Sequence, residues 1–223
     1  MTRTVRTRFA KDPLSALTHF IGLLLSIAGL VALCVLSRHD GPKLAVMTTY
    51  GATLVTLFLA STCYHFFDLG EHGNRWLRRL DHGAIFLLIA GTFAPAVLHL
   101  TSGTGRVFLL SIVAALALTG IIFKVVWVEC PDKLSTILYL GLSWLCLVPG
   151  WWMFPQLTPG AIAWLAAGGV AYTIGALIYL KERPDPWPGL FGHHEVWHLC
   201  VLAGAAAHFM FTRSCIDLTD PPC

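Results

Sequence analysis

Seven stretches of roughly twenty mostly apolar residues follow one another along this chain, and they constrain its fold more than any other feature. A helix needs about 20 such residues to cross a hydrocarbon core roughly 30 Å thick. The breaks between the stretches are short, rich in polar residues, proline or glycine, and too short for a second folded domain. The predicted spans are Leu14–Leu36, Leu44–Phe67, His82–Leu100, Val107–Val128, Ser135–Phe154, Ala161–Leu180 and His194–Thr212.

The composition agrees with a membrane protein. Hydrophobic residues make up 56% of the chain and charged residues 12%, and the mean hydropathy is +0.70. Soluble globular proteins carry roughly 25% charged residues, so this chain cannot cover a surface that faces water. Disorder is excluded for the same reason, and the stretches are about twice too long for barrel strands. We therefore predict a single all-α domain over residues 1–223, an integral membrane bundle of seven transmembrane helices in the cell (inner) membrane.

The lysine and arginine residues predict the orientation, because basic loops stay on the cytoplasmic side. Eleven of them precede the first span or follow the second, fourth and sixth: Arg3, Arg6, Arg8, Lys11, Arg75, Arg78, Arg79, Lys124, Lys133, Lys181 and Arg183. Four lie on the other side: Arg38, Lys43, Arg106 and Arg213. We expect a cytoplasmic tail over residues 1–12 and an outside tail over 213–223. The net charge of +3 is too small for a nucleic-acid partner.

The seven cysteines form no C-x-x-C pair. Most lie in or beside the predicted spans, where a thiol behaves as a small apolar group. Cys215 and Cys223 both follow the last span, and a disulfide between them is an alternative that the sequence leaves open.

Polar side chains gather at the cytoplasmic ends of three predicted spans. An ionisable group at the middle of a membrane helix costs about 2.5–3.5 kcal/mol on insertion scales, so each needs a reason. His65 lies near the end of the second span, with Ser61 one turn deeper. Asp81 directly precedes the third span, and His194 and His198 occupy the first turns of the seventh. These groups therefore lie at one depth of one leaflet.

The spacing of these residues predicts a metal site. His194 and His198 are four residues apart and share a helix face, as do Ser61 and His65. Two histidines one turn apart can chelate one ion, and a histidine from a facing helix completes the set. Catalytic zinc keeps three protein ligands and leaves the fourth position to water. We predict that His65, His194 and His198 bind zinc, that Asp81 orients or deprotonates the water, and that Ser61 supports an intermediate or a ligand.

Each residue also has a purely structural interpretation. His194 and His198 can be interfacial histidines at a helix start, and His65 can end a span beside the headgroups. Asp81 can cap the third helix through its carboxylate, and Ser61 can be a packing residue. The combination favours the metal site, because independent structural roles do not predict that all five groups lie at one depth.

Residues 194–198 read H-E-x-x-H, a pattern that elsewhere marks metalloproteases with the glutamate as general base. The pattern is short, and we find no second acidic metal motif in another span, so the protease is a minor alternative. Glu195 can still act as a local proton acceptor. His19 lies at the same depth in the first span and is a candidate to support the ligands. His208 lies deeper in the last span, and the sequence suggests no partner for it.

Taken together, these motifs resemble those of bacterial hemolysin III proteins, within the family of progestin and adipoQ receptors. The resemblance covers nearly the whole chain. It rests on Leu17-Thr18-His19, on Ser61-x-x-x-His65, on Asp81 with the stretch from Ile85 to Pro95, and on Phe191-Gly192 through His198 followed by His208-Phe209.

The resemblance implies a zinc site near the cytoplasmic face, held by His65, His194 and His198 and supported by Ser61 and Asp81. The wider superfamily includes alkaline ceramidases, so the implied chemistry is hydrolysis of a lipid amide or ester. Eukaryotic relatives are receptors, and the bacterial branch is named for a haemolytic, pore-forming activity. Three hypotheses stay open: a zinc-dependent lipid hydrolase, a cytolytic membrane protein, and a non-catalytic lipid sensor. A membrane lipid is the expected substrate or ligand in the first and third.

Overall fold

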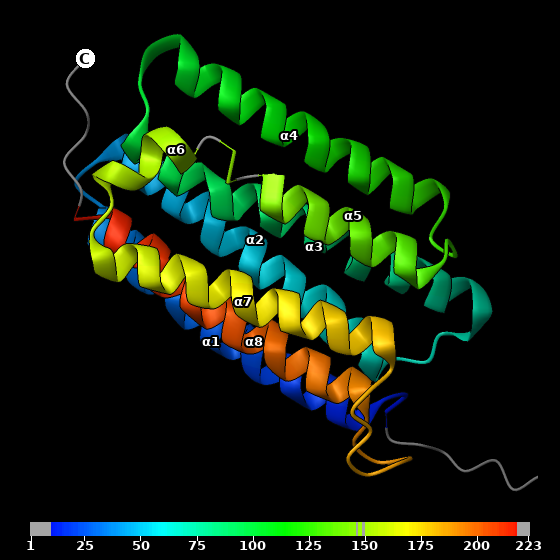
Figure 1. The fold of residues 1–223 in the computed structure, drawn as a ribbon. Helices are drawn as coiled ribbons and strands as arrows, with labels where there is room; N and C mark the ends of the chain where they lie inside the picture. Colours follow the sequence, from blue (N-terminus) through cyan, green and yellow to red (C-terminus); the bar gives the residue numbers. More distant parts are fainter. Residues whose placement is uncertain (1–9, 146, 149, 218–223) are drawn as a thin grey trace, which may run out of the picture.

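A computed structural model describes residues 10–145, 147–148 and 150–217, which form a bundle of helices (Figure 1). In chain order the elements are α1 Pro13–Ser37, α2 Gly41–Phe66, α3 Gly70–Leu100, α4 Gly103–Val126, α5 Asp132–Leu145, α6 Gly150–Met153, the 3-10 helix η1 Phe154–Gln156, α7 Pro159–Lys181 and α8 His193–Cys215. Cys223 lies outside the described residues, and so do Arg3, Arg6 and Arg8 of the predicted cytoplasmic tail.

The predicted seven-helix membrane bundle is confirmed. Five helices are long and apolar enough to cross a membrane, namely α1, α2, α3, α4 and α7. Helix α8 has 23 residues, which is also sufficient in length, but the polar side chains of its first turns, such as His193 and Glu195, lower its hydropathy. Helices α5 and α6 together with η1 cover the fifth predicted span.

Helix α3 begins twelve residues earlier than predicted, at Gly70 rather than His82. The segment from Asp68 to Leu80 was expected to be a break because it is polar, and this prediction was wrong for most of its length. A polar segment can be helical when it faces water, and Arg75 pairs here with Glu71 one turn before it at 2.9 Å. Asp81 therefore lies inside α3, and its interpretation as an N-cap is also wrong.

The fifth predicted span, Ser135–Phe154, is not one continuous helix. Helix α5 begins at Asp132 and ends at Leu145, and the short helix α6 begins only at Gly150. The sequence Pro149-Gly150 gives the physical reason, since proline removes a backbone donor and disfavours the helical conformation of the preceding residue.

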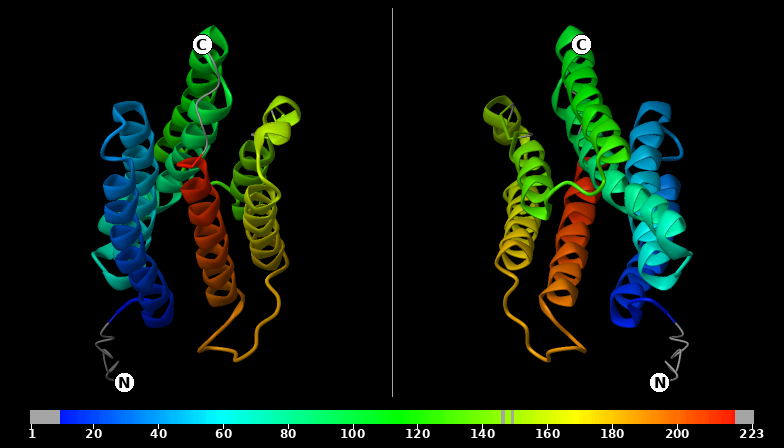
Figure 2. Two further views of the ribbon diagram at one scale, coloured as in Figure 1. Left: turned by 90° about the vertical axis from the view of Figure 1, so that its left-hand side faces the viewer. Right: turned by 90° about the vertical axis from the view of Figure 1, so that its right-hand side faces the viewer.

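Helix α8 lies in the middle of the arrangement. Consecutive helices pack side by side from α1 to α4, and α7 packs along α8. Helix α8 also contacts α1 and α3, and α5 contacts α3 and α7. In Figure 2, α8 is seen between the pair α1–α2 on one side and α7 on the other. The first and last helices of the bundle are therefore neighbours.

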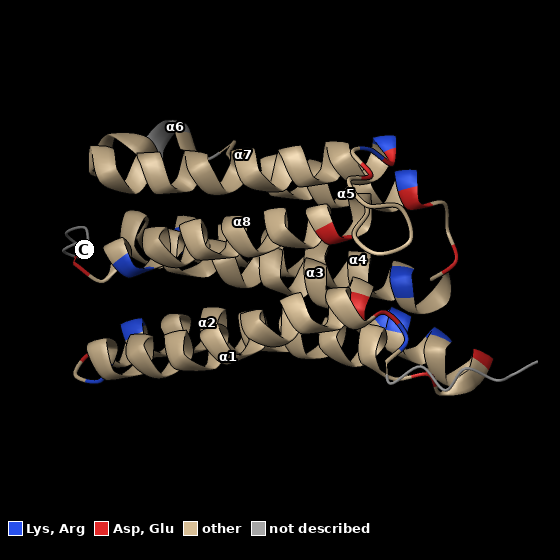
Figure 3. Cartoon of the chain, turned by 90° about the horizontal axis from the view of Figure 1, so that it is seen from below, with Lys and Arg blue, Asp and Glu red and all other residues tan. Residues whose placement is uncertain are grey.

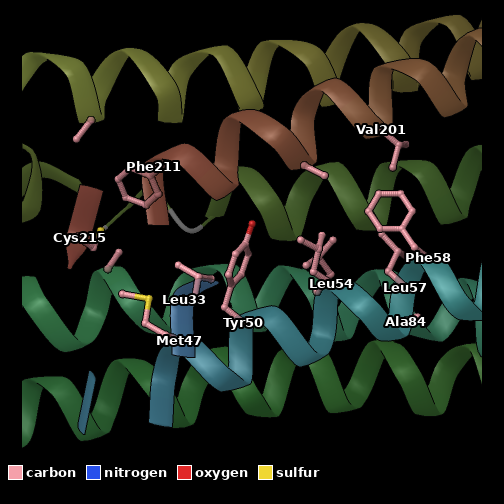
Figure 4. Packing of buried hydrophobic residues seen from close by; sticks show 14 of the residues in the cluster. Leu33, Met47, Tyr50, Leu54, Leu57, Phe58, Ala84, Val201, Phe211 and Cys215 are labelled. Atoms are coloured by element: carbon pink, nitrogen blue, oxygen red, sulfur yellow. The ribbon is translucent and has the colours of Figure 1, made fainter. Parts of the chain in front are cut away.

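A core of buried apolar side chains holds α2 against α8. Leu54, Leu57 and Phe58 on α2 are buried in one cluster with Val201 and Phe211 on α8 (Figure 4). Most of the remaining apolar surface faces outward, as expected where lipid rather than water surrounds the helices. These side chains link α8 to α2 in the interior of the bundle.

Charged residues gather at one end of the bundle, beside the beginning of α1 (Figure 3). We call this the basic end. The helix termini that meet there are the ends of α2, α4 and α7 and the beginnings of α1, α3, α5 and α8. Its described basic residues are Lys11, Arg75, Arg78, Arg79, Lys124, Lys133, Lys181 and Arg183. The positive-inside rule predicts that the basic end faces the cytoplasm.

Candidate metal centre

Three histidines converge at the basic end. His65 is the penultimate residue of α2, while His194 and His198 lie in the first two turns of α8. Each offers one ring nitrogen, and the three nitrogen atoms lie within 4.8 Å of one another. The Nε2 atoms of His65 and His194 are 3.5 Å apart. The structure therefore brings together the residues that the sequence predicts as ligands, although His65 and His194 are 129 residues apart in the chain.

The cluster is buried as well as compact. The exposed fraction is 3% for His65 and 0% for His198, and His194 is partly buried. The Nε2 atom of His198 is buried and has no hydrogen-bond partner within the described part of the chain. A buried polar atom of this kind needs a partner, and neutral imidazole nitrogen suits zinc and similar cations. The residues present therefore fit a metal ion.

Asp12 supports His65 from the far side of its ring. Its Oδ2 atom lies 3.0 Å from Nδ1 of His65, and its backbone N–H donates to the carbonyl of His65 at 2.8 Å. The hydrogen bond from His65 holds the pKa of Asp12 below its ordinary value. An imidazole that donates from Nδ1 keeps its Nε2 lone pair for a metal. Asp12 thus selects the form of His65 that can act as a ligand.

The residues before α1 are docked on the end of α2. Lys11 donates its backbone N–H to the carbonyl of Phe66 at 3.2 Å, and its ammonium lies 3.5 Å from the ring centre of Tyr64. Sequence reasoning assigned this segment to a cytoplasmic tail and so missed Asp12. Asp12 could have been suggested from the sequence, because it is an acidic residue directly before a membrane span, at the same end of the bundle as His65.

His198 is held by residues of α1. Its Nδ1 atom lies 3.3 Å from Oγ1 of Thr18. Its ring stacks on that of His19, with 3.6 Å between centroids and 15° between planes. His19 has an exposed fraction of 2% and lies beside His198, as expected of a residue that the sequence suggests as a support for the ligands. The stacking fixes the ring plane of His198 and so the direction of its Nε2 atom.

Ser61 connects the histidines to Asp81. Its Oγ atom lies 2.7 Å from Nδ1 of His19, and its hydroxyl also hydrogen-bonds the carboxyl of Asp81. Ser61 and Asp81 are both buried, with exposed fractions of 2% and 6%. The hydroxyl therefore joins α1, α2 and α3 in one polar network. Asp81 also lines a polar cavity together with His65 and Arg78.

Glu195 is occupied by contacts that explain it structurally. Its Oε2 atom accepts a hydrogen bond from the backbone N–H of Gly192 at 2.8 Å, which caps the beginning of α8. Its Oε1 atom accepts one from the hydroxyl of Ser15 at 2.8 Å, which ties α8 to α1. These contacts favour a capping role over the general base of an H-E-x-x-H protease.

Two cavities meet beside the cluster. A cavity of about 460 Å³, lined mostly by apolar residues of α3, α5, α7 and α8, reaches Ser61 and His19. A smaller polar cavity of about 290 Å³ is lined by His65, His194 and Asp12 among others. The residues that line both are Asp81, His82, Tyr179 and Trp197. Two of the three cluster histidines, His65 and His194, thus line the polar cavity, which adjoins the apolar cavity at these four residues.

Known proteins are similar in sequence to this chain over nearly its full length. The profile of the family described as Haemolysin-III related matches residues 7–209. The chain is 38% identical to Hemolysin-3 of Bacillus cereus over 212 residues, which is 94% of this chain and 93% of that protein. It is 36% identical to the Hemolysin-3 homolog of Bacillus subtilis (strain 168) over 197 residues, 87% and 89% of the two chains.

A more distant relative comes from an animal. The chain is 28% identical to the adiponectin receptor protein of Drosophila melanogaster over 219 residues, which is 86% of this chain and 48% of that protein. The family match at residues 7–209 includes the segments that carry all three histidines of the cluster.

Proposed function

The chain belongs to the haemolysin-III related family, and we propose that it is a zinc-dependent membrane hydrolase of a lipid amide or ester. The observation that carries this proposal is the convergence of one nitrogen atom each from His65, His194 and His198 within 4.8 Å. Three protein ligands are typical of catalytic zinc, whereas structural zinc is usually closed by four. Zinc bound there would polarise a carbonyl oxygen and supply a nucleophilic water at neutral pH.

The two cavities support an amphiphilic substrate. The apolar cavity, with Leu88, Ile89 and Val201 in its wall, suits a hydrocarbon chain. The polar cavity, which Arg78 and Tyr179 help to line, suits a headgroup. Because His65 and His194 line the polar cavity, which adjoins the apolar one at Asp81 and three neighbouring residues, we expect the bond at the junction of chain and headgroup to lie beside the cluster. In acyl lipids that bond is an amide or an ester.

Asp81 is the group that we assign to proton transfer. It lines both cavities and hydrogen-bonds Ser61, so its carboxyl is fixed beside the junction. A positioned carboxylate can take a proton from an attacking water and return it to the leaving amine or alkoxide. Ser61 positions this carboxyl and, through His19, the ring of His198. In this proposal Asp81 contacts the reacting atoms, and Ser61 acts through its neighbours.

Two other functions follow from the names of the relatives. The adiponectin receptor protein of Drosophila suggests a lipid sensor, in which the metal only ties α2 to α8. Hemolysin-3 of Bacillus cereus suggests a cytolytic protein. The polar network around Asp81 favours the hydrolase, since a metal that only joins two helices does not need a buried carboxyl beside it.

The experiment measures metal content and lipid turnover on the same sample of full-length protein in lipid nanodiscs. The variants are His65→Ala and His198→Ala, with His193→Ala as the matched control. His193 is the neighbour of a ligand and tilts against Tyr179, with 6.4 Å between ring centroids. Turnover is followed as free fatty acid released from a panel of N-acyl and O-acyl lipids.

We expect about one zinc per chain and fatty-acid release in the wild type and in His193→Ala, and neither in the other two variants. Zinc without release from any lipid of the panel would overturn the hydrolase in favour of the sensor. Leakage of dye from liposomes that persists in His198→Ala would favour the cytolytic function, because leakage would then be independent of the metal.

A further inference from the structure

A lysine, a cysteine and a serine contact one another at the basic end, outside the histidine cluster. The Nζ atom of Lys124, in the last turn of α4, lies 3.2 Å from Sγ of Cys130 and 2.6 Å from Oγ of Ser135. Sγ of Cys130 lies 3.1 Å from the same hydroxyl oxygen. The proposed hydrolysis uses none of these groups, although lysine and cysteine are both chemically reactive side chains.

All three side chains are buried. The exposed fraction is 0% for Lys124, 1% for Cys130 and 3% for Ser135. Within the described part of the chain, the ammonium of Lys124 contacts a sulfur atom and a hydroxyl oxygen but no carboxylate. A buried charge needs an opposite charge beside it, and the thiolate of Cys130 is the anion that can supply one. The thiolate is also the form of cysteine that reacts as a nucleophile, and a lysine in contact with the sulfur atom favours it.

The turn between α4 and α5 brings Cys130 back against α4. The backbone N–H of Cys130 donates to the carbonyl of Trp127 at 3.3 Å, and the backbone N–H of Ser135 donates to the carbonyl of Pro131 at 3.2 Å. Lys124 precedes Cys130 by 6 residues, and α4 ends between them. The two side chains therefore meet because the chain reverses its direction there, and hydrogen bonds of the turn keep them in contact.

The sulfur atom of Cys130 lies close to two routes by which a small molecule can approach. Ser135 lines the apolar cavity of about 460 Å³, and its hydroxyl is in contact with the sulfur atom. On the other side Pro131, the next residue in the chain, is exposed at the basic end. Rotation of one side chain is a fast motion, and it is enough to admit a molecule nearly as small as water. Burial thus excludes bulky thiol reagents and leaves the cysteine open to hydrogen peroxide.

We propose that Cys130 and Lys124 form a modification site, at which hydrogen peroxide links the two side chains by a reversible sulfur–nitrogen bond. The thiolate of Cys130 attacks one oxygen atom of the peroxide, the oxygen–oxygen bond breaks, and the cysteine becomes a sulfenic acid. The hydroxide that leaves takes a proton from the ammonium of Lys124 and becomes water. The amine then attacks the sulfur atom, the sulfur–oxygen bond breaks, and a second hydroxide leaves as water with a proton from the nitrogen atom.

The reaction balances without a further reactant. One molecule of hydrogen peroxide is reduced to two of water, and the cysteine is oxidised by two electrons. Sulfenic acids condense in this way with thiols and with backbone nitrogen, and here the amine of Lys124 is already in contact with the sulfur atom. Two molecules of a thiol reverse the step, since they restore the free cysteine and lysine and become a disulfide. The modification needs no metal ion and is independent of the proposed hydrolysis.

The test follows trypsin cleavage after Lys124 in the full-length protein. The protein in nanodiscs is treated with hydrogen peroxide, its remaining thiols are blocked, and it is digested and analysed by mass spectrometry. Trypsin cleaves after a free lysine and not after one whose amine is bonded to sulfur. We expect one peptide, 107–133, in place of peptides 107–124 and 125–133, lighter than its linear form by two hydrogen atoms. Dithiothreitol added after the peroxide should restore the two separate peptides.

The variants assign the bond to one pair of side chains. Cys130→Ser should lose the linked peptide completely. Lys124→Arg keeps a cation beside the sulfur atom and a trypsin site, but its guanidinium is a poor nucleophile. In this variant the sulfenic acid should persist, and dimedone should label Cys130 more strongly than in the wild type. Cys34→Ser is the matched control, because Sγ of Cys34 contacts the hydroxyl of Thr48 at 3.3 Å, and it should form the linked peptide in full.

The proposal is overturned if the wild type keeps both separate peptides after peroxide treatment, or if Cys130→Ser still gives peptide 107–133. Equal labelling by dimedone in the wild type and in Lys124→Arg would also overturn it. A linked peptide heavier than the linear one, with an oxygen atom between nitrogen and sulfur, would overturn the direct bond. His65→Ala should lose the metal and still form the linked peptide, so failure of the proposed hydrolysis and failure of this site are separate results.

Discussion

Nδ1 of His65 lies 3.0 Å from Oδ2 of Asp12, while Nε2 of the same ring lies 3.5 Å from Nε2 of His194. The ring thus faces a carboxylate with one nitrogen and the histidine cluster with the other. Carboxylates in this position orient metal-binding histidines and raise their basicity. The affinity for the metal should therefore depend on a residue that lies before the first membrane helix and does not belong to the cluster.

Asp12→Ala should weaken zinc binding about 10- to 100-fold, the usual effect of removing such a carboxylate. The measurement is a competitive titration with a zinc chelator on the purified protein. Asp68→Ala is the control, because Asp68 lies at the same basic end but hydrogen-bonds Asn74 and Gly70. Equal zinc affinities for Asp12→Ala and Asp68→Ala would show that Asp12 does not support His65.

Asp81→Asn should keep the metal and lose most of the hydrolysis. The amide has nearly the shape of the carboxylate but cannot take a proton, so the rate should fall by about 10²–10⁴. Turnover and zinc content are measured together, as for the histidine variants. Asp132→Asn is the control, since Asp132 also lines the apolar cavity but pairs with Arg78 at 3.1 Å. Unchanged turnover in Asp81→Asn would remove Asp81 from the mechanism.

Ser61→Ala should destabilise the bundle, because it leaves Nδ1 of His19 and the carboxyl of Asp81 without their shared hydroxyl. The expected loss is about 1–3 kcal/mol, read from denaturant unfolding in detergent micelles. Ser26→Ala provides the comparison. Ser26 is also buried on a membrane helix, but within the described part of the chain its hydroxyl bonds only the carbonyl of Leu23 in its own helix. A loss in Ser61→Ala no larger than in Ser26→Ala would argue against the network.

Glu195→Gln separates the hydrolase from the metalloprotease pattern. A glutamine can still cap the beginning of α8, so we expect zinc content and lipid turnover close to those of the wild type. If Glu195 were the general base, turnover would instead fall by about 10²–10⁴. A loss as large as that of Asp81→Asn would reassign proton transfer from Asp81 to Glu195.

Much of the candidate site can be predicted from local spacing. His194 and His198 lie one turn apart in any helix that contains them, and the apolar pattern places His65 at the same end of the bundle. Their approach within 4.8 Å depends on the packing of α2 against α8, which spacing alone does not determine. The predicted orientation of each span was enough to place all three histidines on the same side of the membrane at one depth.

Other parts of the structure have no local signal. Asp12 acts through a segment before α1 that docks on α2, and a pattern of apolar residues says nothing about such a contact. The first turns of α3, from Gly70, could not be predicted from hydrophobicity, because a helical segment that faces water lacks the apolar run of a membrane span. The stacking of His208 on Tyr172 needs the register between α7 and α8, which only the three-dimensional packing fixes.

X-ray absorption at the zinc edge tests the central claim most directly. For the wild-type protein loaded with one zinc per chain, we predict three imidazole nitrogen ligands at about 2.0–2.1 Å and one oxygen ligand from solvent. In His198→Ala the three-nitrogen shell should be absent. A zinc environment containing sulfur, or one that is the same in the wild type and in His198→Ala, would contradict a metal centre built from His65, His194 and His198.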